Sequence, residues 1–179
     1  MSAYETEIAK VYADSDALAS KIDRLLPTSN DLVGLVLRGH LIVEELLFAA
    51  CTAYCRDPAH LKMARLRFPQ LVSLLRALEK IPVVPPAYWS ALLELNSLRN
   101  TLAHQLEHQD LGSRTARFVI AVGQVGLQRP LPKPDTSPEA LEAALHYIIG
   151  GLQSVAVLHS ALETLLRARS LESKCETVS

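Results

Sequence analysis

Apolar residues recur every three or four positions along most of the chain, which is the spacing of amphipathic α-helices. Proline and clusters of Ser, Asn and Asp interrupt this spacing and mark the helix ends. Helices are expected over 3–25, from about 30 to Cys55, over 59–65, from Pro69 to about Lys80, from Pro86 to about Glu107, over 113–126, and from Ser137 to about Arg169 with a bend at Gly150–Gly151. No stretch has the alternation of a β-strand, so the pattern predicts an all-α fold.

The helices are expected to form one domain over residues 1–170, followed by a polar C-terminal tail over 171–179. A proline-rich segment at 129–134 should be an extended link between the last two helices. The prediction is a single helical bundle with additional flanking helices.

The second predicted helix is apolar on two sides. One side consists of Leu32, Val36, Val43, Leu46 and Ala50, and the opposite side consists of Leu37, Leu41 and Phe48. Such a helix is either central in the core or part of a subunit interface, and the pattern leaves both interpretations open. Gly34 and Gly39 would allow another backbone to approach it closely.

Charge and composition exclude some functional classes. Eighteen basic and nineteen acidic residues give a formal net charge of -1, so no overall positive field attracts the protein to nucleic acid. A general DNA-coating protein is therefore disfavoured, whereas an enzyme that engages a few phosphates is not. Acidic residues at the N-terminus do not resemble a signal peptide, and Glu44 and Glu45 interrupt the most apolar stretch, 41–53.

The cysteines bear on the cellular compartment that the sequence predicts. Cys51, Cys55 and Cys175 form neither a disulfide framework nor a zinc-ligand pattern, and the first two are expected to be small core thiols. A cytoplasmic protein without a membrane partner, a metal or another cofactor is expected.

The helix from Pro86 carries the clearest chemical signal. Tyr88, Leu92, Leu95, Leu102 and Leu106 have the spacing of a buried seam. Arg99 occupies the seam position between Leu95 and Leu102. A guanidinium cannot lose its proton there, and its burial without partners would be very costly. A charge that interrupts an apolar pattern in this way often marks a functional site.

Two polar residues accompany this cation. Asn100 and His104 are four positions apart, so they share a helix face, and the long Arg99 side chain can reach towards them. Together they offer a permanent cation, an orienting amide and an imidazole that titrates near neutrality. These groups suit phosphodiester cleavage, in which His104 would move the proton of a ribose hydroxyl while Arg99 holds the phosphate.

Arg99 to His104, after the leucine-rich run 92–98, resembles the Arg-x4–6-His motif of the HEPN superfamily. The segment 38–47, Arg-Gly-His-Leu-Ile-Val-Glu-Glu-Leu-Leu, is similar to the preceding HEPN core helix, which often carries an acidic residue. The segment 68–75 is similar to the mannitol-repressor-like branch. The resemblance covers about residues 30–108.

This resemblance implies a HEPN-like up-and-down bundle that forms a homodimer and joins two Arg-x4-His motifs in one cleft. It implies a metal-independent endoribonuclease that acts on an RNA substrate, often as a toxin or phage-defence effector with a cognate antitoxin or regulatory protein. Arg99 would hold phosphate, Asn100 would orient it, and His104 would be the acid/base. Glu44 or Glu45 would be the supporting acid, and the face shared by His40 and Glu44 slightly favours Glu44.

Two alternatives accompany this hypothesis, and a basic cluster has two interpretations of its own. Mannitol-repressor-like members are regulators, so a non-catalytic interaction module is an alternative, in which Arg99 only bridges to an acidic residue on another helix. His104–His108 also matches the His-x-x-Glu-His pattern of certain zinc proteases, although no sheet accompanies it. Lys62, Arg65 and Arg67 form a basic cluster, which is either a solvated face or an RNA-contacting rim.

Overall fold

The computed structural model describes residues 31–79, 82–104, 110–126 and 136–176, together with positions 16, 17, 20, 22 and 24–26. The regular elements in these ranges are the α-helices α2 (Leu32–Ala53), α3 (Pro58–Ala64), α4 (Phe68–Leu78), α5 (Pro86–His104), α6 (Leu111–Gly123) and α7 (Pro138–Glu176). The all-α prediction is therefore confirmed for the described part of the chain. The link predicted at 129–134, and most of the helix predicted over 3–25, lie outside it.

Side-chain caps begin three of these helices where the sequence places them. Asp31 accepts a hydrogen bond of 3.0 Å from a backbone N–H in the first turn of α2. Asp57 does the same for α3 at 3.0 Å, and Ser137 for α7 at 3.2 Å. Each cap satisfies a donor that the helix itself leaves unpaired. The helix starts are thus encoded locally.

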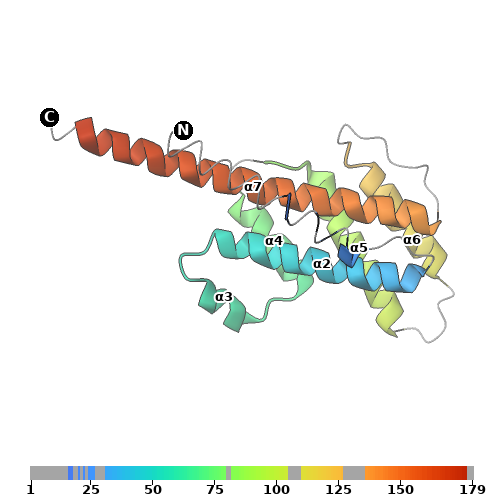
Figure 1. The fold of residues 1–179 in the computed structure, drawn as a ribbon. Coiled ribbons are helices and arrows are strands. Elements are labelled where there is room, and N and C mark those ends of the chain that lie inside the picture. Colours follow the sequence, from blue (N-terminus) through green and yellow to red (C-terminus); the bar gives the residue numbers. More distant parts are fainter. Residues whose placement is uncertain are drawn as a thin grey trace.

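The C-terminal helix is longer than the sequence pattern suggested. α7 continues to Glu176, beyond the end expected near Arg169. Residues 170–176 contain no glycine or proline, and they include good helix formers such as Leu171 and Glu172, so nothing in this stretch stops the helix. The bend expected at Gly150–Gly151 does not interrupt it either, since one continuous helix passes through both residues (Figure 1).

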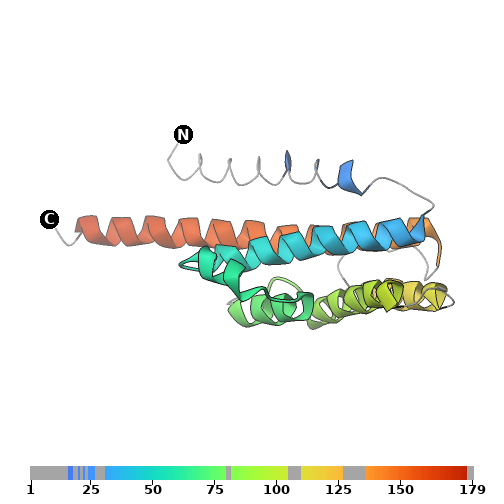
Figure 2. The same cartoon turned by 90° about the horizontal axis from the view of Figure 1, so that it is seen from below.

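The helices form two layers (Figure 2). α2 and α7 lie side by side in one layer, and α4, α5 and α6 form the other. α2 contacts α4 and α5 across the layers, and α6 packs against both α5 and α7. α7 is the longest element and extends past the other labelled helices (Figure 1). α2 therefore has neighbours in its own layer and in the opposite one.

Two glycines let α7 approach its neighbours closely. A Cβ atom on Gly39 of α2 would lie 2.6 Å from a methyl carbon of Leu145 on α7. A Cβ atom on Gly151 would collide with the ring of Tyr88, which is buried and donates a hydrogen bond to the backbone carbonyl of Ile148. Gly39 therefore has the role expected from the sequence. Gly151 fixes the contact between α5 and α7 where a bend was expected.

One apolar side of α2 lies in the core, and the other side is exposed at two of its three residues. Val36, Val43 and Ala50 on the first side are buried. On the second side, Leu37 is 39% exposed and Leu41 is 63% exposed, whereas Phe48 is partly buried against the core. The core-helix interpretation is thus confirmed for the first side only.

The apolar character of α7 also has an explanation in the core. Its segment Pro138–His159 is long and apolar enough to cross a membrane, with a mean hydropathy of 1.4. The core helix of a protein that spans no membrane meets the same criteria, so this is weak evidence for a span. Leu141, Leu145, Ile148 and Leu152 of this segment are buried against the other helices, which accounts for its composition.

Candidate functional site

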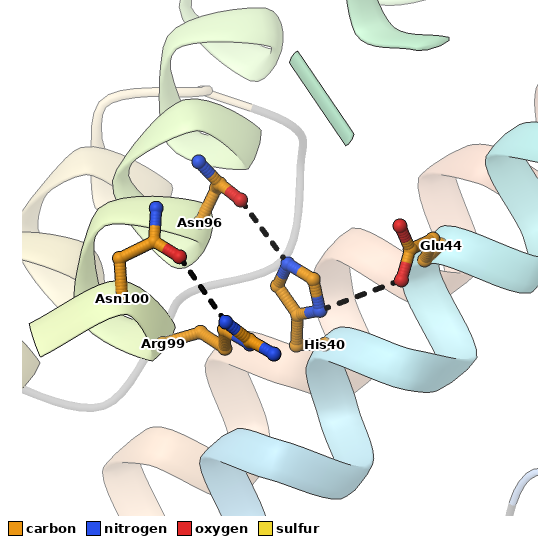
Figure 3. A network of polar contacts seen from close by, with 5 residues as sticks. All are labelled: His40, Glu44, Asn96, Arg99 and Asn100. Carbon is orange, nitrogen blue, oxygen red and sulfur yellow. Dashed lines mark hydrogen bonds and ion pairs between the residues drawn. The ribbon is translucent and has the colours of Figure 1, made fainter. Parts of the chain in front are cut away.

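His40 is the centre of a polar network between α2 and α5 (Figure 3). Its side chain is buried, with a relative exposure of 5%. The imidazole stacks on Phe68, the first residue of α4, with ring centroids 4.5 Å apart and an interplanar angle of 26°. The ring is therefore held between three helices, and its two nitrogens face different partners.

Each nitrogen of His40 faces a polar atom. Nε2 lies 3.3 Å from Oδ1 of Asn96 on α5. Because an amide oxygen only accepts, Nε2 donates in this arrangement. Nδ1 lies 3.9 Å from Oε2 of Glu44, one turn further along α2. That distance is too long for a hydrogen bond, but it allows a strong charge interaction when the imidazole is protonated.

The surroundings of His40 lower the pKa of its imidazole below the ordinary value of 6.5. Burial is the largest cause, because it disfavours the charged form. The hydrogen bond to Asn96 and the charge of Glu44 oppose this shift, while the charge of Arg99 adds to it. His40 is consequently a mainly neutral imidazole at neutral pH, with a cation and an anion acting on it in opposite directions.

Arg99 lies on the leucine-lined face of α5, but its side chain is half-buried. Leu95 and Leu98 are fully buried, so the apolar seam continues through Leu98 beside the cation. Nη1 of Arg99 lies 3.4 Å from Oδ1 of Asn100, and Figure 3 shows the guanidinium beside His40. The charge therefore remains at the solvent edge of the seam, which removes most of the cost of burying it.

Asn100 and His104, the other two members of the sequence motif, lie at different places on α5. Asn100 is exposed and accepts from Arg99. His104 is the last residue of α5, and its side chain lies outside the described residues. Five residues of α-helix separate the backbones of Arg99 and His104 by about 7.5 Å along the axis.

The two candidate supporting acids lie at different places. Glu44 joins the network through its contact with His40, and its side chain is 38% exposed. Glu45, the next residue on α2, is exposed. Of the two candidates, Glu44 is therefore the one that contacts the buried imidazole.

The basic cluster is on the surface at α3 and the connection that follows it. Lys62, Arg65 and Arg67 are all exposed. Arg65 ends α3 in the left-handed region, with φ of 47°. Arg67 immediately precedes Phe68, the residue that stacks on His40. The connection with these charges therefore leads directly into the wall of the His40 site.

Sequence reasoning noted His40 only as a neighbour of Glu44, and it did not assign Asn96 to the site. Both belong to polar pairs spaced four residues apart, His40 with Glu44 on α2 and Asn96 with Asn100 on α5. Such pairs mark a helix face but do not show which faces meet.

Cys51 lies in the core and Cys55 packs against it, as expected. Cys51 is fully buried, and burial raises the pKa of its thiol to about 11. Its Sγ lies 3.6 Å from the carbonyl oxygen of Leu71, and Cys55 Sγ lies 3.3 Å from that of Cys51. Within the described ranges, no three His, Cys, Asp or Glu side chains are grouped as a metal site. The side chains of the zinc pattern considered at His104–His108 lie outside the part of the chain that the structure describes.

The arrangement offers a fixed cation at a solvent edge, backed by a buried imidazole and a carboxylate. Such a set can bind an anion and respond to protons. No protein-family model, curated protein or solved structure matches this chain.

Proposed function

We propose that this protein is a metal-independent endoribonuclease of the HEPN type that acts as a toxin or phage-defence effector. Arg99 holds the scissile phosphate, Asn100 orients it, and His104 is the acid/base. The observation that carries the proposal is the position of Arg99. Arg99 is half-buried, its guanidinium lies at a solvent edge beside His40, and it is on the same helix as His104.

This chemistry has specific requirements that the residues can meet. Cleavage at a ribose 2′-hydroxyl needs a group that removes its proton and a cation that stabilises the charge developing on the phosphate. His104 supplies the first and Arg99 the second, and neither step requires a metal. Lys62, Arg65 and Arg67 would add phosphate contacts along the RNA. A homodimer would bring two copies of the motif together, and a cognate antitoxin would restrain the activity.

The deciding experiment is RNA cleavage in EDTA by the wild type, Arg99→Ala and His104→Ala. We expect the wild type to cleave and both variants to lose at least about a hundredfold in rate. Arg76→Ala and His146→Ala are matched controls, because Arg76 is exposed on α4 and His146 pairs with Glu142 on α7. Both controls should cleave like the wild type. The proposal is contradicted if His104→Ala cleaves RNA as fast as the wild type, or if the wild type does not cleave RNA.

A second candidate function is a non-catalytic, mannitol-repressor-like regulatory or interaction module. It is favoured by the exposed Leu37 and Leu41 on α2, since adjacent large apolar residues on a surface are typical of interaction sites. This candidate predicts a partner complex that survives His104→Ala and is weakened by Leu41→Glu. Loss of the complex in His104→Ala would contradict it.

A further inference from the structure

Two charges of opposite sign act on the buried imidazole of His40. Glu44 faces Nδ1 from α2, and the guanidinium of Arg99 lies beside the ring from α5 (Figure 3). The contact from α4 is the uncharged ring of Phe68. Beside burial and the hydrogen bond to Asn96, two charged side chains therefore bias the protonation of His40: the Glu44 carboxylate favours the imidazolium and the Arg99 guanidinium opposes it.

An anion bound by Arg99 would change this balance. It would offset the repulsion between the guanidinium and an imidazolium, and it would add an attraction of its own. Protonation of His40 then becomes easier, and by thermodynamic linkage the anion binds more tightly when His40 is protonated.

We infer that His40 is a positioning residue that takes up a proton when a phosphodiester anion binds at Arg99, so that anion binding and protonation at this site are coupled. This inference rests on the proposed function, because the anion is the RNA backbone. His40 does not touch the anion, since its ring is 5% exposed and both nitrogens face protein groups. It acts through the charge it adds behind Arg99.

Protonation also changes what the ring presents to Glu44. With Oδ1 of Asn96 towards Nε2, the imidazolium donates to Asn96 and directs its second N–H towards Glu44, so both ring nitrogens face acceptors. A neutral ring with its hydrogen on Nε2 instead presents a lone pair on Nδ1 to the Glu44 carboxylate. Nε2 donates to Asn96 in both states, so it is the Glu44 carboxylate that is best satisfied by the protonated ring, which the bound anion favours.

The test is the NMR titration of the His40 ring nitrogens in the intact chain. It is made with and without a 2′-deoxy oligonucleotide, which has the phosphodiester backbone but lacks the attacking hydroxyl. A parallel titration uses sodium sulfate, and sodium chloride at equal ionic strength is the reference. We expect the oligonucleotide to raise the His40 midpoint by roughly one pH unit, equivalent to about tenfold tighter binding to the protonated form. An unchanged midpoint overturns the inference, and a rise with sulfate alone overturns the assignment of the anion as a phosphodiester.

Substitution of Arg99 provides a second, independent readout. In Arg99→Gln the midpoint without anion should rise, because a repulsive charge is removed, and the response to the oligonucleotide should disappear. Arg76→Gln, which changes an exposed arginine of α4, should behave like the wild type. An unchanged response in Arg99→Gln overturns the inference.

These measurements are separate from the test of the proposed function. The oligonucleotide cannot be cleaved by attack of a 2′-hydroxyl, so the midpoint shift is observed whether or not the wild type cleaves RNA. If the wild type does not cleave RNA but the His40 midpoint still shifts with the oligonucleotide, the nuclease proposal fails and the coupling of anion binding to protonation stands. If the wild type cleaves RNA but the His40 midpoint does not shift, the coupling fails and the nuclease proposal stands.

Discussion

His40 and Asn96 join the two helix layers through one polar contact, with Nε2 of the imidazole 3.3 Å from Oδ1 of the amide. The imidazole is almost completely buried, whereas Asn96 is half-buried. Because a buried polar group without a partner costs free energy, this contact favours one register of α5 against α2. It therefore positions the motif-bearing helix as well as contributing to the site.

Loss of the Asn96 amide should destabilise the fold. In Asn96→Ala, the donor on His40 Nε2 loses its partner, so the free energy of unfolding should fall by about 1–3 kcal/mol. Urea denaturation followed by circular dichroism measures it. Asn100→Ala removes an exposed amide from the same helix and should change the stability by less than about 0.5 kcal/mol. Equal losses in both variants would show that the His40–Asn96 contact does not contribute specifically.

The lowered pKa of His40 predicts a pH dependence of stability. The unfolded chain titrates near 6.5, and the folded pKa is lower, so the unfolded state binds more protons between these two values. The contribution of His40 to stability is therefore complete above pH 6.5, and it decreases as the pH falls through the interval down to the folded pKa. Urea unfolding of the wild type between pH 8 and 5 measures this.

The matched variant for this prediction is His40→Gln, which keeps a side chain able to bond to Asn96 but cannot titrate. Its stability should depend less on pH over the same interval than that of the wild type. His60→Gln, at an exposed position on α3, serves as a control for loss of a histidine. If the wild type and His40→Gln have parallel stability curves, His40 is not the source of the pH dependence.

Glu44 should have an effect on His40 that Glu45 lacks. The Glu44 carboxylate favours the imidazolium, so Glu44→Gln should lower the pKa of His40 further. Glu45→Gln removes the same charge from the next residue and should leave the His40 titration nearly unchanged. NMR of the ring nitrogens compares the two variants. A larger effect from Glu45 than from Glu44 would reverse the assignment of the supporting acid.

Most of the helices could be predicted from the sequence because their boundaries are encoded locally. Asp31, Asp57 and Ser137 cap the helices that follow them, and apolar spacing identifies the buried faces. The end of α7 was expected too early, since residues 170–176 are mostly polar but contain no helix breaker. Polarity alone does not end a helix.

The site was only partly predictable for a different reason. Periodicity places Arg99 and Asn100 on one helix, and it places His40 and Glu44 on another. Their meeting depends on which faces of α2 and α5 pack together, and this information is not local. The contact between His40 and Asn96 spans 56 residues of sequence. Long-range pairing of this kind cannot be read from the spacing within a single helix.

The Cys51 thiol should be unreactive in the folded protein. It is fully buried, and its pKa of about 11 leaves little of the nucleophilic thiolate at neutral pH. In a Cys55→Ser/Cys175→Ser variant, iodoacetamide at pH 7.5 should modify Cys51 only after urea unfolds the chain. Mass spectrometry measures the modified fraction. Rapid modification of the native variant would mean that the core around Cys51 opens readily.

The contact between α2 and α7 should depend on Gly39. A Cβ atom there would lie 2.6 Å from Leu145, which is fully buried and has little room to move. Gly39→Ala should therefore lower the free energy of unfolding by about 1–3 kcal/mol, despite the better helix propensity of alanine. Gly150→Ala is the matched control, because a Cβ atom at Gly150 meets nothing within 4 Å. It should be neutral or stabilising by up to about 1 kcal/mol. Urea denaturation of both variants gives the comparison, and a stabilised Gly39→Ala would show that α2 and α7 do not require this close approach.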